Sequence, residues 1–539
     1  MYGSITLENR FGVNKMELIS LKYAIFVIVL LVLYYCFPKK YRWYVLLAGS
    51  MAYYVIICKW YVLFIIFTIC TTYGSTIWID KLLKEQNAIV KSHKEDWDRQ
   101  TRKEYKEKGR KKRVAVMLFA LLCNFGILAF LKYIPYAGEL GLLLPLGISF
   151  YTFQSMGYVM DVYREIVEPE KNFFKVALFV SFFPQIIQGP IAIYDKLAGQ
   201  LYEGHSLRLE NLQKGALLVL WGVMKKLVIA DRAVNIINFV MDKPMDFSGT
   251  YVFFAAVVYA LQLYADFSGG IDIVRGIAEM FGITMSTNFN HPYFSRSLTE
   301  YWHRWHMTLG DWCRNYIFYP ISISKRFLNF GKWLKPRFGA HISKVLPGCI
   351  ASVITFIVIG VWHGANMKYL YFGLWNGIVI MLAELFAPVN KKVAGGFFKL
   401  TGLREKGIFA TIISVLWTFM LILVGYYFDI AANASTAFHM LFKSVTDFHI
   451  SELGINNIIL NLGACGLDEY DILLLIICTL LWFFISFVEE NKKLDMRDFI
   501  LSRKLPLRWA IIYLGIFIVI IFGYYGPGVN PADFVYMQF

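Results

Sequence analysis

Residues Thr299–Pro320 read TEYWHRWHMTLGDWCRNYIFYP, and residues Val358–Asn366 read VIGVWHGAN. Both stretches place histidine beside tryptophan in a chain that is otherwise strongly apolar. The second stretch places His363 at the end of the apolar run Ile350–Trp362. An ionisable group is costly in such a position, so it is a candidate for function. The rest of the chain can be interpreted as a scaffold that brings the two stretches together.

The composition indicates an integral membrane protein. Of the 539 residues, 58% are hydrophobic and 17% aromatic, and the mean hydropathy is +0.51. This apolar fraction is far above that of soluble domains. Apolar runs of about 20 residues, the length that crosses a bilayer as a helix, recur along the chain. They are continuous and lack the alternation of a β-barrel. We therefore expect an all-α, polytopic transmembrane protein.

The net charge of +16 is concentrated in segments between the apolar runs. Residues 80–113 hold 13 Lys or Arg against seven Asp or Glu, and residues 325–344 hold six basic and no acidic side chains. By the positive-inside rule these segments, and the basic residues 391–406, are predicted to be cytoplasmic loops. Residues 429–471, with six acidic side chains and one lysine, are predicted to be an extracellular loop.

The alternation of these loops predicts roughly 10–13 membrane segments. Both termini are then extracytoplasmic. No linker rich in Pro, Ser or Gly divides the chain, so residues 1–539 are expected to form a single membrane domain. No basic stripe with interleaved aromatic residues lies in a soluble segment, so a nucleic-acid partner is not expected.

Imidazole accepts and returns a proton near neutral pH, so the histidines are the main candidates for chemistry. His363 is followed by Gly364 and Ala365, which allow close approach, and could be a general base or an acyl nucleophile. The alternative is a packing histidine held by hydrogen bonds. His303 and His306 would share one face if their segment is helical. His306 is a candidate second imidazole, whereas His303 is better explained by an interfacial aromatic belt.

Metal and cofactor chemistry have little support. The H-x-x-H spacing lacks the glutamate of H-E-x-x-H, and only Asp311 offers a nearby carboxylate, so no metal site is expected. The sequence contains no G-x-S-x-G, Walker A loop or dinucleotide fingerprint. We therefore expect no bound cofactor.

Three polar residues interrupt apolar segments elsewhere. Asp266, in ADFSGG, could line a polar tunnel, but Asp266 or Ser268 is more readily a cap for a helix that begins at Ile271. Gln185 and Gln188 lie beside a proline-broken helix, where their amides could satisfy unpaired backbone groups.

Six segments, all within a motif core of about residues 145–377, carry a resemblance to a known family. They are PLGISFYTFQSMGYVMDVYR at Pro145–Arg164, FFPQIIQGPI at Phe182–Ile191, KKLVIADR at Lys225–Arg232, YADFSG at Tyr264–Gly269, EYWHRWHMTL at Glu300–Leu309 and VWHGA at Val361–Ala365. With the ending DFVYMQF, they resemble the membrane-bound O-acyltransferase (MBOAT) family, specifically the branch of the alginate O-acetyltransferase membrane subunit.

The resemblance implies helices around a central funnel and tunnel. It also implies transfer of an acyl group, expected to be acetyl, from a cytoplasmic thioester such as acetyl-CoA to a hydroxyl on the outer side. His363 corresponds to the family's catalytic histidine and His306 to its second histidine, while His303 stands where arginine is usual and receives no role. The residues expected along the tunnel are Trp302, Trp305, Trp362, Asn366, Asp266, Gln185 and Gln188.

The implied partners are the lipid bilayer of a bacterial cell membrane, the acyl donor, a polysaccharide acceptor and an extracytoplasmic protein that completes delivery. Two alternatives stay open. A teichoic acid D-alanyl transferase of the same family would take its donor from a carrier protein, although the length of this chain and its extra carboxyl-terminal spans favour the alginate-like branch. A polysaccharide or lipid transporter or flippase would also use broken helices around a polar centre.

Overall fold

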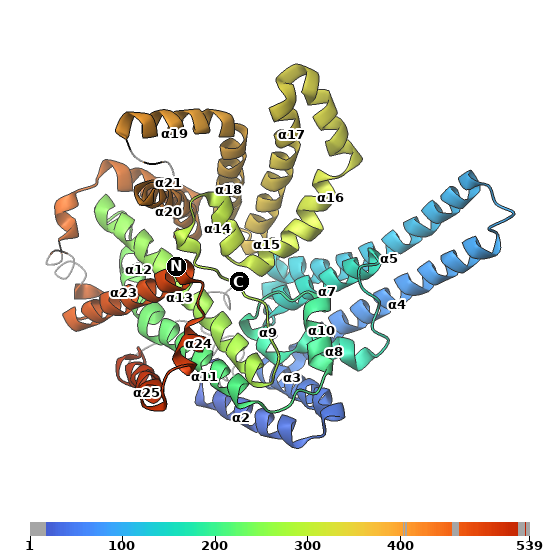
Figure 1. Ribbon diagram of the computed structural model, residues 1–539, viewed down its shortest axis with the longest axis horizontal. Coiled ribbons are helices and arrows are strands. Elements are labelled where there is room, and N and C mark those ends of the chain that lie inside the picture. The colour runs from blue at the N-terminus through green and yellow to red at the C-terminus, as the bar shows by residue number, and fades with distance from the viewer. Residues whose placement is uncertain are drawn as a thin grey trace. The chain divides into compact units, whose positions relative to one another are not determined.

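All regular structure in the described residues of this computed structural model is helical, which confirms the all-α prediction (Figure 1). The structure describes residues 18–402, 404, 407–454, 457, 463–526 and 534. Within them, seven helices, or eight if one bent pair forms a span, are long and apolar enough to cross a membrane. The protein is therefore polytopic, as expected.

The number of long helices is below the roughly 10–13 membrane segments predicted from the apolar runs. Several expected segments are shorter or interrupted helices. The run Leu142–Met160, for example, overlaps α7 (Ile148–Tyr163), which has 16 residues and begins only after Pro145 and Gly147.

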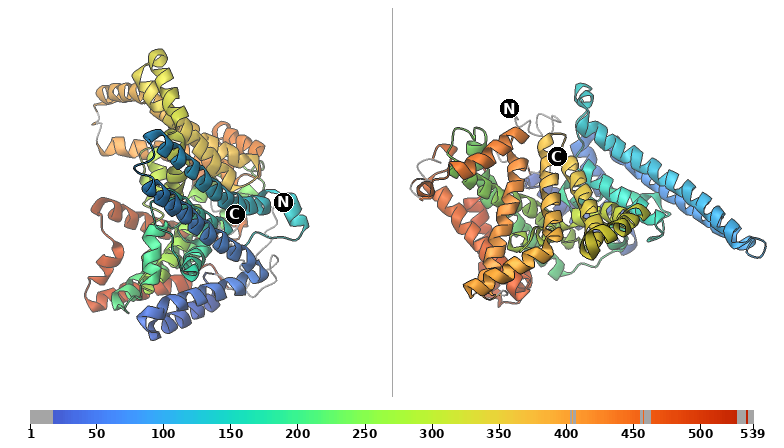
Figure 2. Two further views of the ribbon diagram at one scale, coloured as in Figure 1. Left: turned by 90° about the vertical axis from the view of Figure 1, so that its right-hand side faces the viewer. Right: turned by 90° about the horizontal axis from the view of Figure 1, so that it is seen from above.

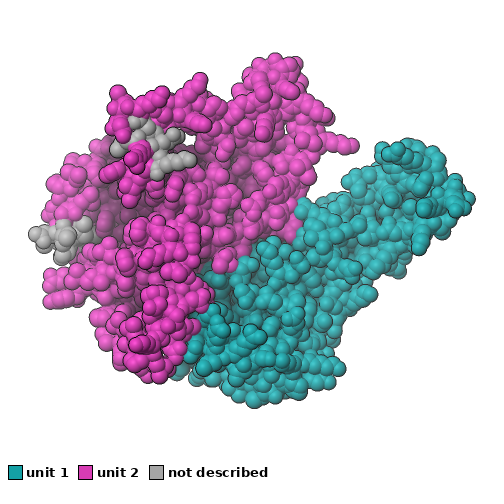
Figure 3. Space-filling model, in the orientation of Figure 1, with its two compact units in different colours: residues 1–219, 271–286 teal, residues 220–270, 287–539 magenta. Residues whose placement is uncertain are grey.

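Contacts divide the chain into two compact units that interleave along the sequence (Figure 3). Unit 1 comprises Met1–Val219 and Ile271–Ser286, and unit 2 comprises Leu220–Gly270 and Thr287–Phe539. Both units contain part of the motif region 145–377. The single domain expected over residues 1–539 stays a prediction.

Unit 1 contains the amino-terminal helices. Helices α11 (Leu209–Met224) and α13 (Gly249–Met280) contribute residues to both units. The other elements of unit 1 are α2 (Leu21–Cys36), η1 (Lys39–Tyr41), α3 (Arg42–Cys58), η2 (Lys59–Tyr61), α4 (Val62–Ser92), α5 (Arg99–Tyr133), α6 (Pro135–Glu139), α7, α8 (Phe173–Ser181), α9 (Phe183–Gln188) and α10 (Tyr194–Tyr202).

The segment predicted to be a cytoplasmic loop, residues 80–113, is mostly helical. Helices α4 and α5 continue well beyond their apolar parts and lie side by side (Figure 2). The segment is rich in Lys, Glu and Arg, which are good helix formers, and the side chain of Asp98 caps α5 by accepting from the backbone of Thr101, 2.8 Å away. The number of charged residues shows that this segment is polar, but it does not determine whether the segment is helical.

Unit 2 contains the carboxyl-terminal helices and two π-helical turns, η3 and η5. Its elements are η3 (Lys225–Ala230), α12 (Asp231–Met241), η4 (Pro292–Phe294), α14 (Leu298–Arg304), α15 (Met307–Cys313), η5 (Arg314–Phe318), α16 (Tyr319–Ser322), α17 (Lys325–His363), α18 (Met367–Leu385), α19 (Ala387–Thr401), α20 (Ile408–Ile430), α21 (Ala434–Thr446), η6 (Ile450–Leu453), η7 (Gly463–Cys465), α23 (Glu469–Lys492), α24 (Met496–Leu501) and α25 (Leu505–Phe522).

The other predicted loops also contain helices. Residues 325–344 form the first part of α17, with a break at Gly339 (φ 81°), and residues 391–401 belong to α19. The predicted extracellular segment 429–471 contains α21, η6 and η7 in its described part. Residues 403, 405–406, 455–456 and 458–462, which fall in these predicted loops, lie outside the described residues. The side of the membrane assigned to each segment stays a prediction.

Helices α17 and α18 pack backbone to backbone, and this contact positions His363. A Cβ atom on Gly360 would overlap the carbonyl oxygen of Tyr369, and one on Gly373 would overlap that of Phe356. Glycine is therefore required where the two helices approach. The contact lies just before the end of α17, so it holds the last turn of that helix against α18.

Candidate active site

His306 lies at a break between two short helices. Helix α14 ends at Arg304 and α15 begins at Met307, and His306 has a left-handed backbone, φ 43° and ψ 52°. A non-glycine residue in this region is strained, and such strain is concentrated at functional sites. His303 and His306 would share one face only on a continuous helix, and the helix stops between them. His303 is exposed on α14.

The side chain of His306 is 1% exposed. Its Nδ1 lies 3.1 Å from Oδ1 of Asn288. The ring of Phe267 meets the imidazole edge to face, with 4.9 Å between ring centroids. The imidazole is thus held on two sides.

His363 is the last residue of α17, as the apolar run predicted. The N–H of Gly364 closes the helix on the carbonyl of Val361, 3.2 Å away. The imidazole is partly exposed and contacts the ring of Phe372 on α18, with 5.5 Å between centroids. The helix end therefore presents His363 beside the aromatic face of α18.

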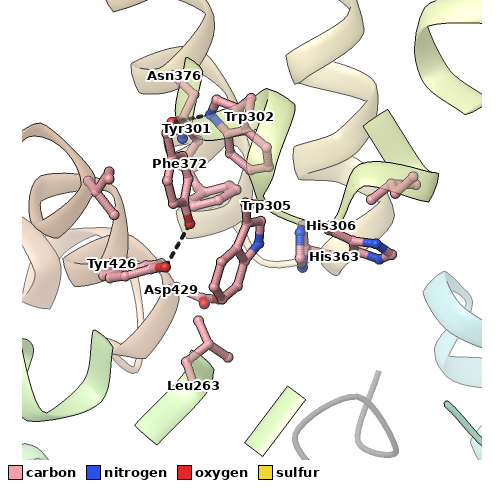
Figure 4. A pocket seen from close by; sticks show the side chains of 12 residues that line it. Leu263, Tyr301, Trp302, Trp305, His306, His363, Phe372, Asn376, Tyr426 and Asp429 are labelled. Atoms are coloured by element: carbon pink, nitrogen blue, oxygen red, sulfur yellow. Dashed lines mark hydrogen bonds between the residues drawn. The ribbon is translucent and has the colours of Figure 1, made fainter. Parts of the chain in front are cut away.

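One pocket in unit 2 contains both imidazoles (Figure 4). Burial, and then the positive form of His363, lower the pKa of His306, so His306 is neutral at neutral pH. Most of the pocket wall is aromatic or aliphatic. The lining residues are Leu263, Tyr301, Trp302, Trp305, His306, Leu309, His363, Phe372, Asn376, Ile422, Tyr426 and Asp429.

Hydrogen bonds fix the polar side chains of the wall. Trp302 donates its Nε1–H to Oδ1 of Asn376, 3.0 Å away, and Asn376 donates to the carbonyl of Phe372, 2.8 Å away. The first bond crosses from α14 to α18, and the second lies along α18. The tryptophan expected at the site from sequence therefore has a fixed ring orientation in the pocket wall.

A chain of tyrosines supports another part of the wall. Tyr293 donates to the carbonyl of Ala260, 2.6 Å away. The hydroxyl of Tyr426 lies 3.1 Å from that of Tyr293. The hydroxyl of Tyr301 lies 2.8 Å from that of Tyr426 (Figure 4). A carbonyl can only accept, so donation runs from Tyr301 through Tyr426 to Tyr293. The chain ties α14, α20 and η4 to α13.

Asp429 is a pocket residue that the sequence reasoning did not select. Its Oδ2 accepts from the hydroxyl of Tyr259, 2.7 Å away. Lys368 donates to the backbone carbonyls of Asp429 and Ala431, at 2.7 and 2.8 Å, and so caps the end of α20. The signal was present, because Asp429 directly follows the apolar run Ile408–Phe428, much as His363 follows its own run.

Four of the predicted site residues line the pocket: Trp302, Trp305, His306 and His363. Trp362 and Asn366 do not. Trp362 is buried beside His363, and Asn366 caps α18 by accepting from the backbone N–H of Lys368, 3.1 Å away. No group of three or more His, Cys, Asp or Glu within the described residues is arranged to hold a metal ion.

The two glutamines belong to unit 1 and do not line this pocket. The side-chain amide of Gln185 donates to Oε1 of Gln154, and Nε2 of Gln154 donates to the carbonyl of Phe179. Gln188 is fully buried, and its amide atoms have no hydrogen-bond partner within the described residues. The expected pairing of both amides with the backbone is therefore not observed.

Asp266 lies inside a continuous helix, so the predicted cap is wrong. Helix α13 runs through it, and its Oδ1 lies 2.7 Å from Nζ of Lys226. The same ammonium lies 2.8 Å from Asp231, and neighbouring Lys225 donates to Ser268, 2.8 Å away. Asp266 does not line the pocket. These buried charges link η3, α12 and α13.

Replacing Lys226 with methionine is expected to destabilise unit 2 by about 3–5 kcal/mol, because two buried carboxylates lose their shared cation. Thermal unfolding of the purified protein in detergent would measure the change. A matched control is Lys84→Met in the exposed Lys84–Asp80 pair of α4, where about 0–1 kcal/mol is expected. Equal shifts in melting temperature for both variants would contradict the structural role of this cluster.

Comparison with known proteins confirms the resemblance of the motifs. Residues 169–335 match the membrane-bound O-acyltransferase family. A probable alginate O-acetylase of Pseudomonas syringae pathovar tomato is 30% identical over 315 residues, which are 58% of this chain and 54% of that protein. A peptidoglycan O-acetyltransferase of Helicobacter pylori is 29% identical over 314 residues, 51% of this chain and 56% of that protein.

A more distant relative has a different named activity. A teichoic acid D-alanyltransferase of Bacillus subtilis is 26% identical over 288 residues, which are 52% of this chain and 67% of that protein. The match to the two O-acetyl-transferring relatives spans little more than half of their length.

Proposed function

We propose that this chain is a member of the membrane-bound O-acyltransferase family, which its residues 169–335 match, and that it is an enzyme that transfers an acetyl group to a hydroxyl. The donor in this proposal is a cytoplasmic thioester, acetyl-CoA, and the acceptor is a cell-surface polysaccharide. The observation that carries the proposal is the pocket in which His363 and His306 meet between aromatic walls.

The chemistry needs one base and one route for a proton. His363 takes the proton from the acceptor hydroxyl as its oxygen attacks the thioester carbonyl, so that a C–O bond forms and the C–S bond breaks. The imidazolium then returns the proton to the departing thiolate. The apolar rings around the pocket exclude water, which would otherwise hydrolyse the thioester.

The proposed orientation follows the charge pattern. The basic segments 80–113 and 325–344 face the cytoplasm and the anionic donor, while segment 429–471 and both termini face outward. An extracytoplasmic partner protein completes delivery to the polysaccharide in this scheme.

D-Alanyl transfer from a carrier protein is a second candidate, and one observation favours it. The carboxylate of Asp429 lines the pocket, and a carboxylate is a suitable partner for the ammonium group of an alanyl ester. One relative is named as a D-alanyltransferase. In this case His363 would have the same role, and Asp429 would select the acyl group.

The test is to release esters from the cell envelope with mild alkali, in cells that produce this protein and in cells that lack it. Acetate that depends on the protein supports the proposal. D-Alanine that depends on the protein supports the second candidate instead. If neither product depends on it, acyl transfer is overturned and a transporter or flippase becomes the better explanation.

A further inference from the structure

The side-chain oxygen of Asn288 collects three hydrogen bonds beside the pocket. Nδ1 of His306 lies 3.1 Å from this oxygen, the backbone nitrogen of Thr308 lies 3.1 Å from it, and the hydroxyl of Thr308 lies 2.8 Å from it. Asn288 is 1% exposed, and its backbone carbonyl accepts from the N–H of Met307, 2.9 Å away. A single residue thus holds three successive residues at the strained turn.

The backbone N–H of Thr308 determines which way the amide of Asn288 faces. A backbone N–H can only donate, so the atom that it contacts must be the oxygen and not the NH₂ group. That oxygen has no proton to give to His306. Nδ1 of His306 must therefore carry the proton and donate it to Asn288, which leaves the lone pair of the neutral ring on Nε2.

We propose that Asn288 is a positioning residue that keeps His306 in the Nδ1–H tautomer, so that Nε2 accepts a hydrogen bond from the protonated form of His363. The inference rests on the proposed function, in which His363 gains a proton as the hydroxyl attacks. The two imidazoles line the same pocket, and the positive form of His363 lowers the pKa of His306.

The tautomer decides the sign of this interaction. With the proton on Nδ1, the negative end of the His306 dipole at Nε2 stabilises the imidazolium that forms on His363. With the proton on Nε2, a positive N–H would be presented to the same cation. Asn288 thus acts on the reaction through His306, without touching the reacting atoms.

The first measurement is the tautomer itself. The full-length protein, with ¹⁵N-labelled histidine and in lipid bilayers, gives separate solid-state NMR signals for protonated and unprotonated ring nitrogens. The His306 signals are those lost in His306→Gln. We expect the Nδ1–H form in the unsubstituted protein, and finding the Nε2–H form would overturn the inference. This readout needs no substrate and no Asn288 variant.

Activity measurements then test the consequence. Asn288→Ala is expected to lower the acetyl-transfer rate by about 10- to 100-fold and to release the tautomer, whereas Asn288→Asp, which keeps the accepting oxygen, recovers at least part of the rate and the Nδ1–H signal. Thr308→Val is the matched control, because it removes one donor from the same oxygen but leaves the bond to His306, and the tautomer is unchanged.

Two outcomes separate this inference from the function on which it rests. An Asn288→Ala protein of unchanged melting temperature that keeps both the tautomer and the rate would overturn the inference alone. If the unsubstituted protein transfers no acyl group, the proposed function fails, while the NMR result still decides whether Asn288 sets the tautomer.

Discussion

Replacing His363 with alanine is expected to lower the rate of ester formation by about 10²–10⁴-fold, the range that general base catalysis contributes. The physical reason is that an uncharged hydroxyl is a weak nucleophile, and the pocket offers this imidazole, at the end of α17, as the base. Rates of acetyl transfer from acetyl-CoA by the protein in lipid vesicles would measure the loss. The amount of folded protein must be equal in the two samples.

The matched control for His363 is His303→Ala. His303 belongs to the same tryptophan-rich segment as His306 but is exposed and does not line the pocket. Its removal is expected to change the rate less than about threefold, as for surface substitutions remote from a site. Ester formation that survives at an unchanged rate in a folded His363→Ala protein would remove His363 as the base.

Replacing His306 with glutamine is expected to lower the rate by about 10²-fold, because glutamine fills similar space but cannot offer an imidazole nitrogen to His363. The pH dependence sharpens this prediction. Burial and the positive form of His363 lower the pKa of His306, to about 3, so His306 binds a proton only in strong acid and is neutral throughout the physiological range.

It follows that His306→Gln lowers the rate by the same factor between about pH 5.5 and 8, since His306 does not titrate there. Rates measured across this range for both proteins would check the prediction. If an ionisation near pH 6.5 disappears in the variant, His306 titrates in the active enzyme and its assigned neutral role is wrong. If His306→Gln leaves the rate of acetyl transfer unchanged, His306 takes no part in the reaction.

Several features of the site could be predicted from the sequence because each depends on a local pattern. A histidine directly after an apolar run is costly wherever the helix ends, so His363 was selected without knowledge of its neighbours. The same principle applied to the run Ile408–Phe428 would have selected Asp429. His306 was selected for its tryptophan-rich segment, although the helix that would relate it to His303 stops between them.

Other features depend on contacts between distant segments. Asn288 precedes His306 by one short helix and a turn, and nothing in its local sequence indicates that its oxygen would bind Nδ1 of that histidine. Asp266 was expected to cap a helix from its ADFSGG context. Its pairing with Lys226 became apparent only when η3 was placed against α13.

The sequence by itself determined the class of the protein, the apolar helices and the two histidines, because hydrophobicity and the energetic cost of buried polar groups act residue by residue. Only the tertiary structure decided that His306 and His363 line one pocket and that Asp266 pairs with Lys226. The tautomer of His306, the ring orientation of Trp302 and the lining of the pocket depend on atoms that are close in space but belong to residues distant in the sequence. Such proximity is a property of packing, which local pattern does not contain.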